Sequence, residues 1–242
     1  MNNTIQEMID RQSIRAYKDK EITKEDKDLI INAGINGPSA GNMQLYSIID
    51  VKDKDTIEKL SVLCDNQPFI KNAKMVLVFC ADYEKWYNAF NDLDLNPRLP
   101  GKGDLLLAIE DAMIVAQNTV NAAWSLGIGS CYIGDIMENY EEVTKLLELP
   151  DYVYPACMVV YGYIDENQTR KFKPKRVDNK YVVFENKYRS LNNEELKDMF
   201  ESRNINEDYE TWMKKFIERK YNSDFSKEMC RSANKYIERF SD

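Results

Sequence analysis

The segment from Asp104 to Leu126 is the strongest helix signal in the sequence, and it constrains the fold more than any other. Its apolar residues recur at spacings of three and four: Leu105, Ile109, Ala112, Ala116, Val120 and Ala123. These side chains extend around most of the helix circumference, and several are alanine. We therefore expect this helix to lie in the middle of the structure with close neighbours. Gly127 ends it as a C-cap residue.

Apolar runs of strand length occur both before and after this helix in the sequence. Met75–Ala81 and Pro155–Ile164 predict interior strands, and Tyr46–Val51 predicts a third strand. Thr23, followed by Asp26 three residues later, predicts the start of a further helix.

The C-terminal tail is expected to be helical, because no glycine follows Gly162 and no proline follows Pro174. It carries two apolar stripes at helical spacing. One contains Tyr209, Trp212, Met213, Phe216, Ile217 and Tyr221, and the other Phe225, Met229, Ala233, Tyr236, Ile237 and Phe240. Such stripes have to pack on the body of the chain or on a partner subunit.

Composition excludes several classes of function. The net charge of -8 argues against a nucleic-acid binder. No run of about 18 apolar residues predicts a membrane span, and no secretory signal is recognised. Five widely spaced cysteines without a C-x-x-C pair are typical of the cytoplasm. Histidine is absent, which excludes Ser-His-Asp and Cys-His schemes and histidine-liganded zinc.

Two polar clusters are candidates for an anion site. In the stretch Arg11-Gln12-Ser13-Ile14-Arg15, two guanidinium groups flank a hydroxyl, a donor-rich set that suits a phosphate. The stretch Arg170–Arg176 contains five basic residues in seven. The alternative for each is a solvated, charged loop.

Two glycine-containing stretches suggest close approach of backbone to a ligand. Gly37–Gln44 offers small residues beside Ser39, Asn42 and Gln44, although it could equally be a plain connector. Gly127–Gly134 is not a dinucleotide-binding loop, because a helix precedes it and its third glycine comes two positions late.

In their order and spacing, these pieces resemble the FMN-dependent nitroreductase family from about Arg11 to Tyr188. The motifs are Arg11–Arg15, Pro38–Gln44, Gln67, Asp111-Ala112, Ala116–Asn118, Ser125–Gly129, Tyr132–Gly134, Lys173–Arg176 and Glu185–Tyr188. The helical tail is similar to that of the oxygen-insensitive, NADPH-preferring nitroreductases and their flavin-reductase relatives.

The resemblance implies an α+β fold, with a central mixed sheet wrapped by helices and a C-terminal helical extension. Residues 1–190 would form the FMN-binding domain, and residues 191–242 an extension packed on the body or on the partner subunit. The family also implies a homodimer with FMN at the subunit interface. No catalytic side chain and no metal ion are expected.

The resemblance assigns roles to particular residues. Arg11, Gln12, Ser13 and Arg15 would hold the flavin phosphate and the polar edge of the ring, and Lys173 with Lys175 or Arg176 would complete the phosphate clamp. Pro38, Ser39, Ala40 and Asn42 would approach the flavin from the neighbouring subunit. Gln67 would bond the pyrimidine edge, and the backbone at Ile133 and Gly134 would face N5.

Two departures from the family pattern leave questions open. Asp135 follows Gly134, where many relatives have glycine or glutamate, so a side-chain role for Asp135 is not implied. Lys175 intervenes before Arg176 in the usual Lys-Pro-Arg trio, so either residue can occupy the phosphate position.

The expected activity is ping-pong hydride transfer from NADPH or NADH, through bound FMN, to nitroaromatics, quinones or similar small molecules. Because the cofactor supplies the hydride chemistry, the lack of histidine is no obstacle. The alternatives are an NAD(P)H:flavin reductase, a flavin-binding carrier or sensor with little turnover, and a helical interaction protein that binds no flavin.

Overall fold

The computed structural model describes residues 2–168, 173–203 and 207–240. The chain divides into two compact units. The first comprises Met1–Thr169 and Glu228–Asp242, and the second comprises Arg170–Lys227.

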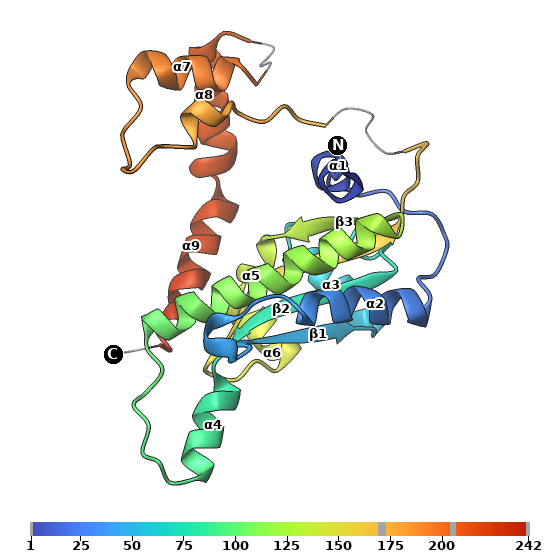
Figure 1. The fold of residues 1–242 in the computed structure, drawn as a ribbon, viewed down its shortest axis with the longest axis vertical. Coiled ribbons are helices and arrows are strands. Elements are labelled where there is room, and N and C mark those ends of the chain that lie inside the picture. The colour runs from blue at the N-terminus through green and yellow to red at the C-terminus, as the bar shows by residue number, and fades with distance from the viewer. Residues whose placement is uncertain (1, 169–172, 204–206, 241–242) are drawn as a thin grey trace. The chain divides into compact units, whose positions relative to one another are not determined.

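The first unit alternates helices with the strands of one sheet (Figure 1). Its elements are α1 (Asn3–Asp10), α2 (Lys24–Ile35), the 3-10 turn η1 (Ala40–Asn42), β1 (Tyr46–Val51), α3 (Lys54–Leu63), β2 (Met75–Asp82), α4 (Glu84–Asp92), α5 (Lys102–Ser125), β3 (Ile128–Ile133), the 3-10 turn η2 (Asp135–Met137), α6 (Tyr140–Leu147) and β4 (Val153–Tyr163). The expected α+β class is confirmed.

The sheet has the strand order β1-β2-β4-β3, and its three strand pairings are antiparallel. An isolated bridge outside these strand pairings, between Ser13 and Ser130, is parallel. β2 and β4 lie in the interior, as their continuous apolar runs predict, and every residue of β2 is buried. Pro155 sits in β4 where the register with β2 shifts, which is the position that a residue without an N–H tolerates.

Helix α5 packs across all four strands and beside α2. Its buried face is built from small and branched side chains, among them Ala108, Ala112, Val115, Ala116 and Ala123. Its other face exposes several large apolar residues. Within this unit, the close neighbours expected around most of the helix are therefore found on one face of α5. Gly127 ends the helix with a φ of 73°, the left-handed conformation that favours glycine at a C-cap.

The second unit contains a 3-10 turn and mostly helical structure. Its elements are η3 (Asn179–Tyr181), α7 (Asn193–Glu201), α8 (Tyr209–Phe216), the single π-turn η4 (Ile217–Tyr221) and the start of α9 (Asp224–Ile237). Residues before α7 are tied to it, because Lys180 and Tyr181 bond to Asp198 and Arg189 pairs with Glu195. The first apolar stripe packs on α7 through Phe200, which lies against Tyr209 and Trp212.

The C-terminal half of α9 belongs to the first unit. Tyr236 is fully buried between Tyr140 and Tyr154, with ring centroids 4.6 Å and 5.2 Å away. Phe240 packs on Tyr152 at 5.5 Å. None of the helices in the described residues combines the length and the apolar composition that crossing a bilayer requires.

Candidate functional site

The segment that contains the two arginines lies along the edge of the sheet beside β3. Ser13 and Ser130 form a parallel bridge, and the backbone N–H of Ile14 donates to the carbonyl of Ser130 at 2.9 Å. The Tyr17 hydroxyl donates to the carbonyl of Ile14 at 2.8 Å. Hydrogen bonds therefore fix the backbone from Ser13 to Tyr17.

Two glycines allow this segment to approach the sheet closely. Gly129 and Gly162 face each other across β3 and β4. A Cβ atom on Gly129 would lie 2.5 Å from Ile14 Cγ1, and one on Gly162 would lie 2.7 Å from the Tyr17 ring. The glycine pair therefore forms a notch that accepts Ile14 and Tyr17. No role for this pair was predicted, because a cross-strand pairing cannot be read from the order of residues.

The polar side chains of the segment point away from the notch. Ile14 is buried, whereas Ser13 and Arg15 are exposed, and Arg11 and Gln12 are half-buried. The Arg15 guanidinium lies 5.6 Å from the centre of the Phe69 ring. Among the described residues, neither Arg11 nor Arg15 has a carboxylate within 4.0 Å. Two unpaired guanidinium groups in an acidic protein are suited to an anion.

Cys131 of β3 lies within the electrostatic reach of this group. Burial raises the pKa of its thiol, whereas the positive charges of Arg15 and Arg11 and a hydrogen bond from Ser13 oppose the rise. Arg11, Ser13 and Arg15, three of the four residues predicted in this stretch, therefore lie around Cys131 of β3.

Gln67 is held by a tight turn after α3. Asp65 and Asn66 both have positive φ angles, of 60° and 50°, in the left-handed region that Asp and Asn adopt more readily than most L-residues. The Gln67 amide Nε2 donates to the carbonyl of Cys64 at 2.9 Å and to Asp135 Oδ2 at 2.6 Å. Its backbone N–H donates to the carbonyl of Ser61 at 2.8 Å.

Ile133 and Gly134 come at the end of β3, immediately before the η2 turn. The Ile133 side chain belongs to the core, so the backbone is what this residue can present to a ligand. At Gly134 an added Cβ would meet no atom within 4 Å, so the space in front of it is open. Asp135 begins η2, and its bond to Gln67 gives this departure from the family pattern a structural role.

The Pro38–Gln44 loop is anchored by a residue from the middle of α5. The Asp111 carboxylate accepts from the backbone N–H groups of Ala40 and Leu45, at 2.9 Å and 3.0 Å. The Ser39 hydroxyl accepts from the Gln44 N–H at 3.1 Å, and Asn42 has a φ of 57°. Pro38 and Asn42 are exposed, and Ser39 and Ala40 are half-buried.

Asp111 belongs to the motifs that resemble the family, but no role for its side chain was predicted from the sequence. The signal that would have found it is a carboxylate on the apolar face of the strongest helix, since a buried charge needs partners.

This loop and the arginine segment are separated by α2 in the sequence. The helix has 12 residues, which corresponds to a length of about 18 Å. Figure 1 shows the two segments towards opposite ends of α2. The predicted residues of the first unit therefore form two groups, one around Arg15 and Gln67 and the other around Ser39.

The predicted phosphate clamp belongs to the second unit. Lys173, Lys175 and Arg176 are exposed there, whereas Arg170 and Lys171 of the same basic run lie outside the described residues. Their participation in the site stays a prediction.

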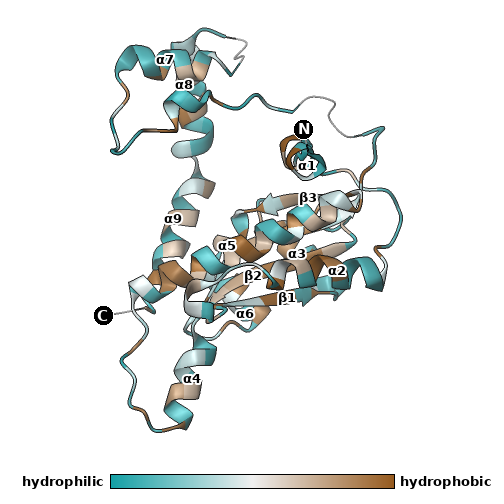
Figure 2. Ribbon diagram, in the orientation of Figure 1, coloured by the Kyte–Doolittle hydropathy of each residue, from teal (hydrophilic) through white to brown (hydrophobic). Residues whose placement is uncertain are grey.

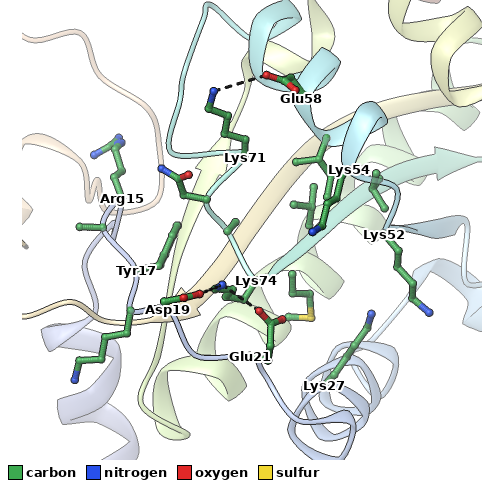
Figure 3. Close-up of a pocket in the computed structure, with 18 of the residues that line it drawn as sticks. Arg15, Tyr17, Asp19, Glu21, Lys27, Lys52, Lys54, Glu58, Lys71 and Lys74 are labelled. Carbon is green, nitrogen blue, oxygen red and sulfur yellow. Dashed lines mark hydrogen bonds and ion pairs between the residues drawn. The ribbon is translucent and has the colours of Figure 1, made fainter.

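A groove of about 930 Å³ is lined by Arg15 and by several lysines (Figure 3). Although it is rich in lysine, most of its charges are neutralised. Lys74 bonds to Asp19 at 2.6 Å and to Glu21 at 3.0 Å, and Lys27 bonds to Asp50 at 2.5 Å. The groove is therefore a weaker candidate for an anion site than the arginine segment.

Comparison with known proteins identifies the family. The profile of the Nitroreductase family matches residues 8–163, which include the arginine segment, Gln67, the Asp111 anchor and all four strands. This chain belongs to the Nitroreductase family. The resemblance inferred from the motifs is confirmed.

Curated relatives cover nearly the whole chain. A protein of Bacillus subtilis (strain 168) named FMN reductase (NAD(P)H) is 32% identical over 241 residues, which span 99% of this chain and 92% of the relative. An oxygen-insensitive NADPH nitroreductase of Salmonella typhimurium is 33% identical over 219 residues, with 88% of each chain covered. The solved structure of the NADPH:FMN oxidoreductase from Vibrio harveyi, complexed with NAD+, is 28% identical, has a TM-score of 0.83 and covers 98% of both chains.

Proposed function

We propose that this protein is an FMN-dependent NAD(P)H oxidoreductase that transfers hydride to nitroaromatics, quinones or similar small acceptors by a ping-pong scheme. Family membership and the names of its relatives support the reaction class. The observation that carries the proposal is the gathering of Arg11, Ser13 and Arg15 beside Gln67 and the open backbone at Gly134.

The residues present fit FMN. Its phosphate carries between one and two negative charges near neutral pH, and the two guanidinium groups supply unpaired donors. The pyrimidine edge of the flavin ring presents an N–H between two carbonyl groups. Both N–H groups of the Gln67 amide are engaged by Cys64 and Asp135, so its oxygen remains as the acceptor for that N–H.

Bound FMN would accept hydride from NAD(P)H and deliver it to the acceptor. The protein's part is to hold and polarise the ring. Arg15 supplies positive charge that stabilises the negative charge gained on reduction, and Phe69 restrains the guanidinium. The open space at Gly134 leaves room for the reacting face.

The protein is proposed to act as a homodimer with FMN at the subunit interface. α5 exposes Leu106, Leu107, Met113 and Ile114, with Leu106 62% exposed, and α1 exposes Met8. Figure 2 shows hydrophobic stretches along both helices. An apolar surface of this kind favours burial against a second copy. Because the two groups of site residues lie towards opposite ends of α2, the loop with Pro38, Ser39, Ala40 and Asn42 is proposed to complete the partner's site.

The phosphate clamp is completed in this proposal by Lys173 and either Lys175 or Arg176. The division into a flavin-binding domain, residues 1–190, and a helical extension, residues 191–242, remains part of the proposal. A cytoplasmic location is proposed as well, because five free thiols, four of them buried, are typical of a reducing compartment.

An NAD(P)H:flavin reductase is the second candidate, since relatives carry that name. Comparing turnover with a nitrofuran, a quinone and free FMN at equal concentrations separates the two. A carrier or sensor would show no acceptor-dependent oxidation of the reduced flavin in stopped-flow experiments.

The absorption spectrum of the purified protein is the first test. We expect flavin bands that bleach on anaerobic addition of NADPH or NADH and return when an acceptor is added. A protein that stays colourless after incubation with FMN and desalting would refute the proposal.

A further inference from the structure

The η2 turn carries a buried carboxyl group to which the proposed reaction assigns no part. Glu138 is 4% exposed, and its Oε1 atom has no hydrogen-bond partner among the described residues. A buried, ionised and unpartnered carboxylate is strongly unfavourable. The Glu138 carboxyl group is therefore expected to be protonated, because the protonated form can donate a hydrogen bond.

Three carboxylates and the buried thiol of Cys64, whose own pKa is raised by burial, are the titratable groups of the described residues that face Glu138. Asp135 of η2 lies within hydrogen-bonding reach, Asp65 faces it from the turn after α3, and Glu228 faces it from α9. The nearby Arg231 is already held by Glu228 and Glu141. Burial, followed by these negative charges, raises the pKa of Glu138 to about 7.

Asp135 connects this carboxyl to the flavin-binding amide. Its Oδ2 accepts from Gln67 Nε2 at 2.6 Å. Since Nε2 faces two acceptors, Asp135 and the Cys64 carbonyl, the network leaves one orientation for the amide, with Oε1 directed away from both. The two turns are tied a second time by Asn139, whose side-chain amide donates to the Leu63 carbonyl at 2.8 Å.

We propose that Glu138 is a positioning residue that holds a proton in the folded protein and donates it to Asp135. Asp135 then accepts from Glu138 and Gln67 together, and the Gln67 oxygen is presented to the flavin ring. The flavin as ligand rests on the proposed function, whereas the shared proton does not.

Loss of this proton would place two negative charges in hydrogen-bonding contact. Their repulsion would separate Glu138 from Asp135 and loosen the bond that Asp135 accepts from Gln67. The affinity for FMN is therefore expected to fall as the pH rises through about 7.

The experiment uses the full-length apoprotein and measures the FMN dissociation constant by fluorescence quenching, from about pH 5.5 to about pH 8.5, a range that brackets the titration. The wild type is expected to weaken by up to about tenfold, the equivalent of one coupled pKa unit. Glu138→Gln, which keeps a donor towards Asp135 but cannot ionise, should lack this change. Glu142→Gln, at an exposed carboxylate of α6, should behave as the wild type.

The FMN phosphate itself titrates at about pH 6. The quantity to compare is therefore the difference between variants in how the FMN dissociation constant changes with pH. Infrared spectroscopy of the apoprotein supplies a second readout, because a protonated carboxylic acid should be seen near pH 6 in the wild type and be missing from Glu138→Gln.

Equal pH profiles in the wild type and Glu138→Gln would overturn the proposal. If that variant does not fold, the wild-type infrared spectrum decides, and a spectrum without a carboxylic acid band overturns it. A wild type that binds no FMN while showing this band would refute the proposed function and leave the shared proton standing.

Discussion

Replacing Gly129 by alanine tests whether the glycine notch positions the arginine segment. The new methyl group would lie 2.5 Å from Ile14 Cγ1, 2.7 Å from its Cβ and 2.9 Å from its Cγ2. Non-bonded carbon atoms prefer separations of about 3.5–4.0 Å, so Ile14 would have to retreat by roughly 1 Å. Because its Cβ is one of the close atoms, a change of rotamer does not relieve the contact. The backbone from Ser13 to Arg15 has to move instead.

The magnitude has two parts. Overpacking of this kind typically costs about 1–3 kcal/mol of folding free energy. A shift of the segment also lengthens the bonds that Ser13 and Arg15 would make to the cofactor. Losing one charge-assisted hydrogen bond, worth about 1.5–3 kcal/mol, weakens FMN binding by roughly ten- to hundredfold.

Gly103→Ala is the matched control. Gly103 lies in the first turn of α5, and an added Cβ there meets no atom within 4 Å. Alanine in a helix is more favourable than glycine by about 0.5–1 kcal/mol, so this variant should be at least as stable as the wild type.

Urea unfolding measures the stability of both variants, and fluorescence titration of the apoprotein measures FMN affinity. Adding Ile14→Ala to Gly129→Ala should recover part of the affinity, because the shorter side chain removes two of the three close contacts. If Gly129→Ala matches Gly103→Ala in both measurements, the notch has no role in positioning the segment.

Three further predictions concern single side chains. Arg15→Ala should lower FMN affinity by tenfold or more, since a charge-assisted bond is lost, while leaving the thermal midpoint of the apoprotein unchanged because Arg15 is exposed; unchanged flavin content would contradict the assignment. Asp111→Asn should destabilise the protein by about 1–3 kcal/mol in urea, because an amide has one acceptor oxygen for the two N–H groups of Ala40 and Leu45; full stability would show that the loop needs no anchor. For Glu138, the folded pKa of about 7 exceeds the ordinary 4.5, so the folded state retains a proton that the unfolded state loses. Wild-type stability should therefore fall by up to about 3 kcal/mol as the pH rises from about 4.5 to about 7, and Glu138→Gln should abolish this fall; parallel stability curves would refute it.

Elements with a continuous apolar pattern could be predicted from the sequence. Tyr46–Val51 was predicted as a strand with the bounds that the structure gives, and the interior positions of β2 and β4 followed from their apolar runs. The start of α2 was equally readable, because Thr23 caps the helix through the N–H of Asp26 at 3.0 Å. These signals are local, so neighbouring residues are sufficient to produce them.

Features that depend on pairing across the fold could not be predicted. The notch exists because the register of β3 and β4 places Gly129 opposite Gly162, and no local pattern fixes that register. The partners of Asp135 and Glu138 likewise come from the turn after α3 and from α9, which are distant in sequence. The family resemblance supplied the residues that are proposed to face the cofactor, whereas the residues that hold them in place became apparent only in three dimensions.

The absence of histidine sharpens the role of Glu138. In most proteins a titration near neutral pH is assigned first to an imidazole, and this chain has none. Burial moves other groups of the site away from neutrality, since it raises the pKa of the Cys64 and Tyr132 side chains. The FMN phosphate also titrates near this range, at about pH 6. It is not altered by Glu138→Gln, so a pH dependence of flavin affinity that this substitution removes belongs to Glu138. Because Glu138 is proposed to act on the flavin through Asp135 and Gln67, that dependence should be seen in cofactor affinity and not in the rate of hydride transfer at saturating FMN.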